Sequence, residues 1–264
     1  MEKLFVLLQK ELIESWKTYK IAIVFLLCIV TALAVPFFTD SSYSDNPLVS
    51  PLQSSYIVFN FVIYLSVGLT LLIPFTLMNT VAKEVKDGLT AAILTKPAGR
   101  GAYILSKFLV SFAIFAVAIV VGFIICYVYA INTTKPFDPD PVSLEHLFIT
   151  LGFLLLYVAF AISLTIFISS IFKNNIVAGG IALALLVASI GLFMYDPVVR
   201  EFVPFEIVRW GLEYIYPAAF RVGLEFHGTV VIVTNPYWYA LGINIIGVPL
   251  FLLCSIGLMK YKAI

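Results

Sequence analysis

The sequence predicts an all-α membrane protein with six transmembrane helices, and three observations carry this prediction. The 264 residues are 62% hydrophobic and only 12% charged, with a mean hydropathy of +1.06. A soluble domain of this size cannot bury that much apolar side chain. Six apolar stretches are long enough to cross a bilayer core about 30 Å thick, which takes roughly 20 helical residues. Finally, these stretches do not alternate between apolar and polar residues, which favours helices over barrel strands.

The six predicted spans follow one another along a single transmembrane domain that occupies residues 1–264. Their predicted ranges are 21–38, 56–79, 104–131, 147–172, 176–194 and 237–259.

Basic residues set the predicted orientation of these spans. Twelve of the sixteen Lys and Arg fall on one side, and ten of the fifteen acids fall on the other. Because Lys and Arg collect on the cytoplasmic side, we expect both termini in the cytoplasm of a multi-pass cell membrane protein. The net charge of +1 gives no reason to expect a nucleic-acid partner. The twelve are Lys3, Lys10, Lys17, Lys20, Lys83, Lys86, Lys96, Arg100, Lys107, Lys173, Lys260 and Lys262.

Residues 1–20 are predicted to form an amphipathic helix in the membrane interface. Leu4, Phe5, Leu8, Leu12, Trp16 and Tyr19 share one helical face, whereas Lys3, Lys10, Glu14 and Lys17 lie elsewhere. Such a helix lies flat on the bilayer before the chain turns into the first span. The alternative is a simple helical extension of that span. The mixed charges do not suit a cleaved signal peptide, so we expect a permanent anchor.

Residues 80–103 form the most specific local signal. Gly88 can end a helix that extends from the second span, and residues 89–95 are long enough for a second short helix that Pro97 ends. Its apolar side, with Leu89 and Ile93, would seek a groove on a partner, and such a helix can pass force from a soluble motor to the membrane bundle. The alternative is a solvated loop that carries cytoplasmic positive charge.

The order of Glu84, Gly88, Pro97, Arg100 and Lys107 resembles the cytoplasmic connection of ATP-binding cassette (ABC) type-two export permeases. In that family an acidic residue, Gly-Thr, a leucine-rich turn, Pro-x-x-Arg and a following Lys recur between the second and third spans. Leu89 stands where the family has Thr, and Thr90 follows one place later. The six-span layout and the amphipathic N-terminal helix extend the resemblance over the whole chain.

The resemblance implies a coupling helix within residues 81–95 that docks into a cytoplasmic ABC ATPase subunit. It also implies a second permease, identical or homologous. The chain lacks the Gly-x-x-x-x-Gly-Lys-Ser/Thr phosphate loop, so ATP and Mg²⁺ are expected in the partner ATPase. The predicted ATPase-coupling residues are Glu84, Gly88, Leu89, Thr90, Ile93 and Arg100.

Two connections on the predicted outer side carry further signals. Asn132-Thr133-Thr134 fits an N-glycosylation acceptor, whose use depends on the organism. Residues 195–236 are too many for a simple turn. Within them Glu206, Arg209 and Glu213 follow helical spacing. The resemblance implies a lid over the translocation path here, and a purely structural cap is the alternative.

The spans are predicted to contain few side chains that could catalyse a reaction, bind a metal or contact a substrate. The cysteines (Cys28, Cys126 and Cys254) lie in apolar stretches without metal-ligand spacing, and two separated histidines make no metal centre. No catalytic constellation is present, so we expect a transport subunit rather than an enzyme. Asn244, Thr70 and Thr76 are candidates to line a substrate path. The alternative for them is packing, because Ser and Thr in spans mostly bond back to their own helix.

The sequence therefore predicts the permease of an ATP-driven exporter of an amphipathic, lipid-like or peptide substrate, because the cavity walls would be mainly apolar. The alternative is an ion-coupled secondary carrier or channel. Such carriers usually hold ionisable groups deep in their spans. None lies deep in these spans, because Lys107 is close enough to a span end to reach a membrane interface. Unwound backbone at Pro74 or Pro249 can nevertheless coordinate a cation. A scaffold that transports nothing is a third alternative.

Overall fold

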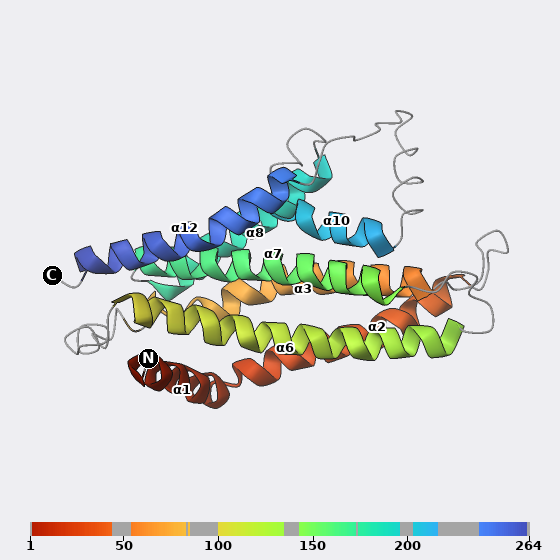
Figure 1. Ribbon diagram of the computed structural model, residues 1–264, viewed down its shortest axis with the longest axis horizontal. Coiled ribbons are helices and arrows are strands. Elements are labelled where there is room, and N and C mark those ends of the chain that lie inside the picture. Colours follow the sequence, from red (N-terminus) through yellow and green to blue (C-terminus); the bar gives the residue numbers. More distant parts are fainter. Residues whose placement is uncertain are drawn as a thin grey trace.

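The computed structural model is a bundle of helices whose long members run side by side along one axis (Figure 1). It describes residues 2–43, 54–82, 84, 100–134, 143–172, 174–195, 203–215 and 238–262, and no strand occurs among them. The helices are α1 (Glu2–Lys17), α2 (Lys20–Tyr43), α3 (Ser54–Leu77), α6 (Arg100–Thr134), α7 (Leu144–Ile171), α8 (Asn175–Tyr195), α10 (Glu206–Ile215) and α12 (Trp238–Lys262).

Helices occupy all six stretches that the sequence predicts as spans. Four of them (α3, α6, α7 and α12) are long and apolar enough to cross a membrane. The bent pair of α1 and α2 supplies up to one more span, and Asn175–Ile190 of α8 is a shorter apolar helix. The protein is therefore all-α in its described part, with four to five candidate membrane spans. Both Pro74 and Pro249 lie inside continuous helices.

Helix α7 is the centre of the bundle and contacts α3, α6, α8, α10 and α12. All ten residues from 157 to 166 are buried, including Tyr157, Ile162 and Ile166. By contrast, α12 exposes large apolar side chains such as Ile246 and Leu253, as lipid-facing helices do. The α1 end of the bundle also holds the C-terminal end of α12 (Figure 1).

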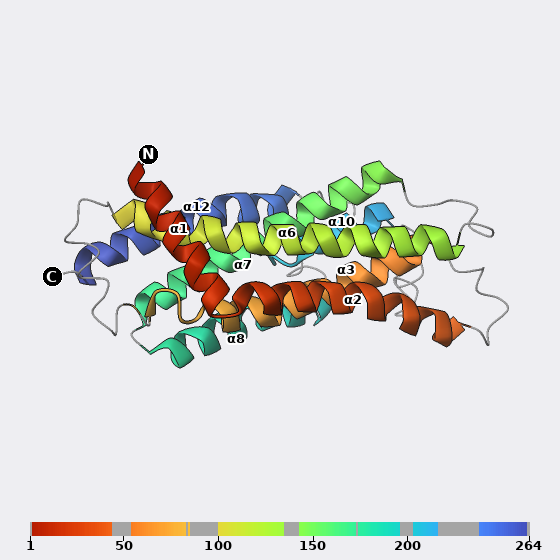
Figure 2. The same ribbon diagram turned by 90° about the horizontal axis from the view of Figure 1, so that it is seen from below.

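Helix α1 crosses the end of the bundle at an angle to the long helices (Figure 2). It meets α2 at a 65° bend, so α1 does not continue α2 as one straight helix. That α1 lies in the membrane interface stays a prediction. At this elbow the backbone of Tyr19 is left-handed, with φ 57°, and the Thr18 hydroxyl caps the Glu14 carbonyl. The side chains of Phe5 and Trp16 are 69% and 72% exposed, whereas α1 turns another face toward α6.

The connection that was predicted over residues 195–236 contains α10, which packs on α7 away from the α1 end (Figures 1 and 2). Arg209 pairs with Glu206 within this helix, as the helical spacing predicts, and both side chains are buried. This pair joins two positions of the same helix, so it stabilises α10 itself.

Candidate functional site

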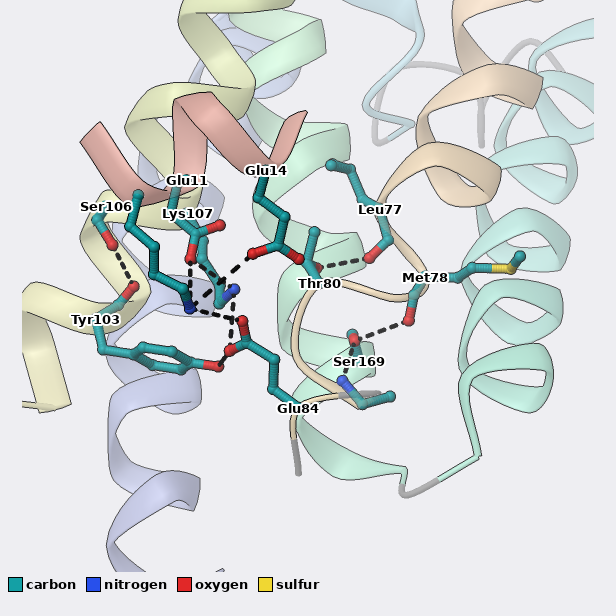
Figure 3. Close-up of polar contacts among 12 residues, drawn as sticks. Glu11, Glu14, Leu77, Met78, Thr80, Glu84, Tyr103, Ser106, Lys107 and Ser169 are labelled. Carbon is teal, nitrogen blue, oxygen red and sulfur yellow. Dashed lines mark hydrogen bonds and ion pairs between the residues drawn. The ribbon is translucent and has the colours of Figure 1, made fainter. Parts of the chain in front are cut away.

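Six polar side chains meet where α1 crosses the bundle, and we call this group the charge cluster (Figure 3). They come from three elements that are far apart in the sequence. The members are Lys10, Glu11 and Glu14 of α1, Glu84 from the segment after α3, and Tyr103 and Lys107 of α6.

Lys107 is the central cation of the charge cluster. Its Nζ lies 2.9 Å from Glu11 Oε1 and 3.2 Å from Glu84 Oε2, and its side chain is 1% exposed. An ammonium this deep in a helical bundle needs paired carboxylates, because an uncompensated charge away from water costs several kcal/mol. Glu11 and Glu84 meet that need from opposite sides.

Glu84 is engaged through both carboxylate oxygens. The Tyr103 hydroxyl donates to Oε2, which also faces Lys107, while Lys10 Nζ lies 3.1 Å from Oε1. Burial by itself raises the pKa of this carboxyl group, but Lys107, Tyr103 and Lys10 together outweigh burial and leave the pKa below its usual value. Glu84 is therefore ionised at neutral pH, and it joins α1 to α6.

Glu11, Glu14 and Glu84 bring carboxylate oxygens within 4.8 Å of one another, a grouping of the kind that can hold a metal ion. In this protein Lys10 and Lys107 stand among the three carboxylates and form ion pairs with them. The chain's own ammonium groups thus supply the positive charge that a metal would otherwise bring.

The segment that leads to Glu84 is fastened to α7 and α8. Ser169 of α7 donates to the Met78 carbonyl at 3.2 Å and accepts from the Ala82 amide at 3.0 Å. Asn175, at the start of α8, donates to the side-chain oxygen of Asn79. Residues 78–82 are consequently held by two helices on one side, and Glu84 is held by α1 and α6 on the other.

Only part of the predicted coupling set lies in the described residues. Glu84 is at the centre of the charge cluster, and Arg100 is the first residue of α6, where it is half-buried. Gly88, Leu89, Thr90 and Ile93 lie outside the described residues, as does the predicted short helix over 89–95.

The partners of Glu84 on α1 and α6 were not predicted. Lys107 was expected to reach a membrane interface, but its side chain is buried between two glutamates. A lysine at the edge of an apolar stretch does signal a need for a carboxylate partner. The sequence shows this lysine but does not identify which acidic residue pairs with it.

The three candidates for a substrate path occupy two different places. Thr70 and Asn244 are both fully buried near the start of α10. The Thr70 hydroxyl lies 2.7 Å from the Tyr157 hydroxyl, and the Tyr157 ring packs edge-on against Phe205. The Asn244 amide donates to the Pro204 carbonyl at 3.1 Å. The first bond joins α3 to α7, and the second joins α12 to the turn before α10. Such contacts fit the packing alternative, and a role of these residues in a substrate path stays a prediction.

Thr76 is the third path candidate, and it lies toward the charge cluster. Its hydroxyl donates to carbonyls of its own helix, at Leu72 and Ile73. It also lines a cavity that contains Glu84. Thr76 is therefore separate from the Thr70 and Asn244 contacts near α10.

The fold and the charge cluster define a multi-pass membrane protein in which long-range ion pairs join helices at one end of an apolar bundle. Residues 30–258 match the family model described as ABC-2 family transporter protein, and the chain belongs to this family. Members of this class are membrane-embedded transport subunits, so the chain is the permease part of an ABC transporter. It is also similar to the uncharacterized transmembrane protein YxlG of Bacillus subtilis (strain 168), with 25% identity over 221 residues, 79% of this chain and 83% of the relative.

Proposed function

We propose that this chain is the permease subunit of an ABC exporter that moves an amphipathic, lipid-like or peptide substrate across the cell membrane. A separate cytoplasmic ATPase supplies the energy, with ATP and Mg²⁺ bound in that subunit. In this proposal all six long helices cross the membrane, both termini are cytoplasmic, and α1 lies in the inner interface with Phe5 and Trp16 toward lipid.

The observation that carries the proposal is the position of Glu84. It stands at the start of the segment that the family resemblance assigns to ATPase coupling, and it is bound to α1 through Lys10 and to α6 through Tyr103 and Lys107. A displacement of this segment would act on both helices at once, because moving Glu84 alone would leave Lys107 with less than its full charge compensation.

Two further features support energy input from a partner. The sequence has no phosphate-binding loop. Among the described residues, the three buried ion pairs with lysine or arginine lie at helix ends or within α10, and not in the middle of a span. An ion-coupled carrier would more commonly place ionisable groups there.

The first test is to purify the tagged chain gently from native membranes and to identify stoichiometric partners by mass spectrometry. We expect an ATPase with a phosphate-binding loop, together with a second permease. A chain that is isolated alone, yet transports in vesicles without ATP, would reject the proposal in favour of an ion-coupled carrier.

The second test asks whether Glu84 couples hydrolysis to transport in the reconstituted complex. Glu84→Gln keeps the size of the side chain but removes its charge, so transport per ATP hydrolysed should fall several-fold while ATPase binding persists. The matched control is Glu145→Gln, which removes an exposed acid at the first turn of α7. If both variants keep the coupling ratio of the unmodified complex, Glu84 has no coupling role.

A further inference from the structure

A cavity of about 530 Å³ lies in the angle between α1, α2 and the C-terminal part of α3. This volume is in the usual range for a small-molecule site. Its lining includes Lys10, Glu14, Lys20, Ile23, Leu72 and Phe75. The cavity borders the charge cluster through Lys10, Glu14 and Glu84, but most of its walls belong to other residues.

The walls of this cavity divide into a charged part and an apolar part. Lys10, Glu14 and Lys20 come from the two sides of the elbow between α1 and α2. The apolar part includes Ile23 of α2 and Phe75 of α3, whose side chains are 45% and 56% exposed. Both belong to apolar helices of the membrane bundle, so we expect the apolar side of the cavity to open toward lipid.

Lys20 differs from the other two lysines near this cavity. Lys10 and Lys107 are matched by glutamates in the charge cluster. Lys20 is half-buried at the start of α2 and forms no ion pair with any residue in the described part of the chain. A partly desolvated ammonium of this kind is a ready site for a phosphate oxygen.

Glu14 provides the complementary group. Its ion pair with Lys10 is long, at 4.0 Å, and its side chain is 45% exposed. The carboxylate therefore retains capacity to accept further hydrogen bonds. The cavity thus offers one cation and one carboxylate to an incoming ligand, and apolar walls beside them.

We propose that this cavity binds a phospholipid of the surrounding leaflet whose headgroup carries a primary amine, as in phosphatidylethanolamine. The phosphate pairs with Lys20, the amine donates to Glu14, and an acyl chain lies along Ile23 and Phe75. A purely anionic headgroup fits less well, because Glu14 and Glu84 both face the cavity. A soluble zwitterion would leave the apolar walls uncovered. The proposal does not depend on what the permease transports.

The test is native mass spectrometry of the purified full chain in detergent, titrated with single lipids of matched acyl chains. We expect phosphatidylethanolamine to bind several-fold more tightly than phosphatidylglycerol, which has no amine, and than phosphatidylcholine, whose quaternary amine has no N–H to donate. Glycerophosphoethanolamine, the same headgroup without acyl chains, should not compete. Equal binding of the three lipids would overturn the proposal. Effective competition by the free headgroup would show that the cavity binds a soluble zwitterion and would overturn the proposal of a lipid ligand.

Two substitutions assign the headgroup contacts. Lys20→Met should weaken binding of phosphatidylethanolamine and phosphatidylglycerol roughly tenfold or more, the usual size for loss of a charge-assisted bond. Glu14→Gln should instead remove the preference for phosphatidylethanolamine over phosphatidylglycerol. The control is Lys17→Met, an exposed lysine of α1 that does not line the cavity.

Unchanged lipid affinity in Lys20→Met, together with unchanged lipid selectivity in Glu14→Gln, would place the lipid elsewhere and overturn the site. If a variant does not fold, the order of the three lipids on the unmodified chain still decides the headgroup chemistry. None of these measurements involves ATP or an ATPase, so failure here leaves the proposed transport function untouched, and the reverse also holds.

Discussion

Each end of the bundle contains a buried ion pair. One pair connects separate helices, and the other connects two residues of the same helix. Lys107 and Glu11 are 96 positions apart, and with Glu84 they join three separate elements. Arg209 and Glu206 are three positions apart within α10. The first pair therefore fixes how elements lie against one another, whereas the second supports the shape of a single helix.

Uncharged contacts join α10 to α7. Thr150 of α7 donates to the Gly211 carbonyl at 2.6 Å, and Gly211 lies so close to α7 that an added Cβ would come within 3.2 Å of the Thr150 Cα. Docking of α10 thus depends on close packing, and the connection from α1 through Glu84 to α6 depends on charge. The two ends should respond differently to substitution and to pH.

The largest expected effect comes from Lys107→Met. It leaves Glu11 and Glu84 buried without their shared cation, so we expect about 3–5 kcal/mol of lost stability, measured by chemical unfolding in detergent. Lys10→Met is the matched control, because Lys10 is 42% exposed and its loss should cost roughly 1 kcal/mol or less. Equal effects of the two variants would contradict a central role for Lys107.

Acid should weaken the charge cluster through Glu84. Its pKa is lower in the folded protein than in the unfolded chain, so its ionisation stabilises the fold above the unfolded pKa of about 4.3. That contribution is lost as the pH falls through the lower, folded pKa. Unfolding measured from pH 6 downward should show a drop in stability below about pH 4.3 that is smaller in Glu84→Gln. The same drop in both proteins would assign acid sensitivity to other groups.

A smaller effect is expected where α8 supports the segment leading to Glu84. A Cβ on Gly179 would lie 2.8 Å from the Cβ of Met78, while a Cβ on the adjacent Gly180 would meet nothing within 4 Å. Gly179→Ala should therefore cost about 1–3 kcal/mol by overpacking. Gly180→Ala should be neutral or slightly stabilising, since alanine favours helix. The two variants are compared by their thermal unfolding midpoints in detergent. An unchanged midpoint in Gly179→Ala would mean that α8 can shift away from Met78 at little cost in stability.

The positions of the long helices were predictable from the sequence. Each helix that crosses a bilayer needs its own long apolar stretch, and such a stretch can be recognised without knowing its neighbours. All six predicted stretches are helical, although their ends differ. Helix α6 begins at Arg100, four residues before the predicted span, because a helix can extend beyond the apolar stretch that sets the predicted range.

The charge cluster was only partly predictable. Glu84 stood out through the family resemblance, but nothing in the sequence pairs it with Lys10 or Lys107. Those contacts follow from the 65° bend at Tyr19, which lays α1 across α6. A non-glycine residue with left-handed backbone leaves no reliable trace in sequence. Long-range pairs depend on such turns, whereas the pair of Glu206 and Arg209 was visible from spacing alone.

The smallest expected effect tests the uncharged contacts near α10. Tyr157→Phe removes the hydroxyl that lies 2.7 Å from Thr70, deep in the bundle. The Thr70 hydroxyl also donates to the Ser66 carbonyl, so it keeps a partner after the change. We therefore expect a loss of about 1 kcal/mol, measured by the same chemical unfolding.

Tyr64→Phe is the control, because Tyr64 is 59% exposed on α3 and its hydroxyl should contribute little. A loss from Tyr157→Phe that approached the value for Lys107→Met would mean that the α10 end also depends on a polar centre. The contrast with the α1 end would then be wrong. A loss near 1 kcal/mol fits a bundle in which apolar packing, including the Tyr157 ring on Phe205, holds α10 while charge holds α1.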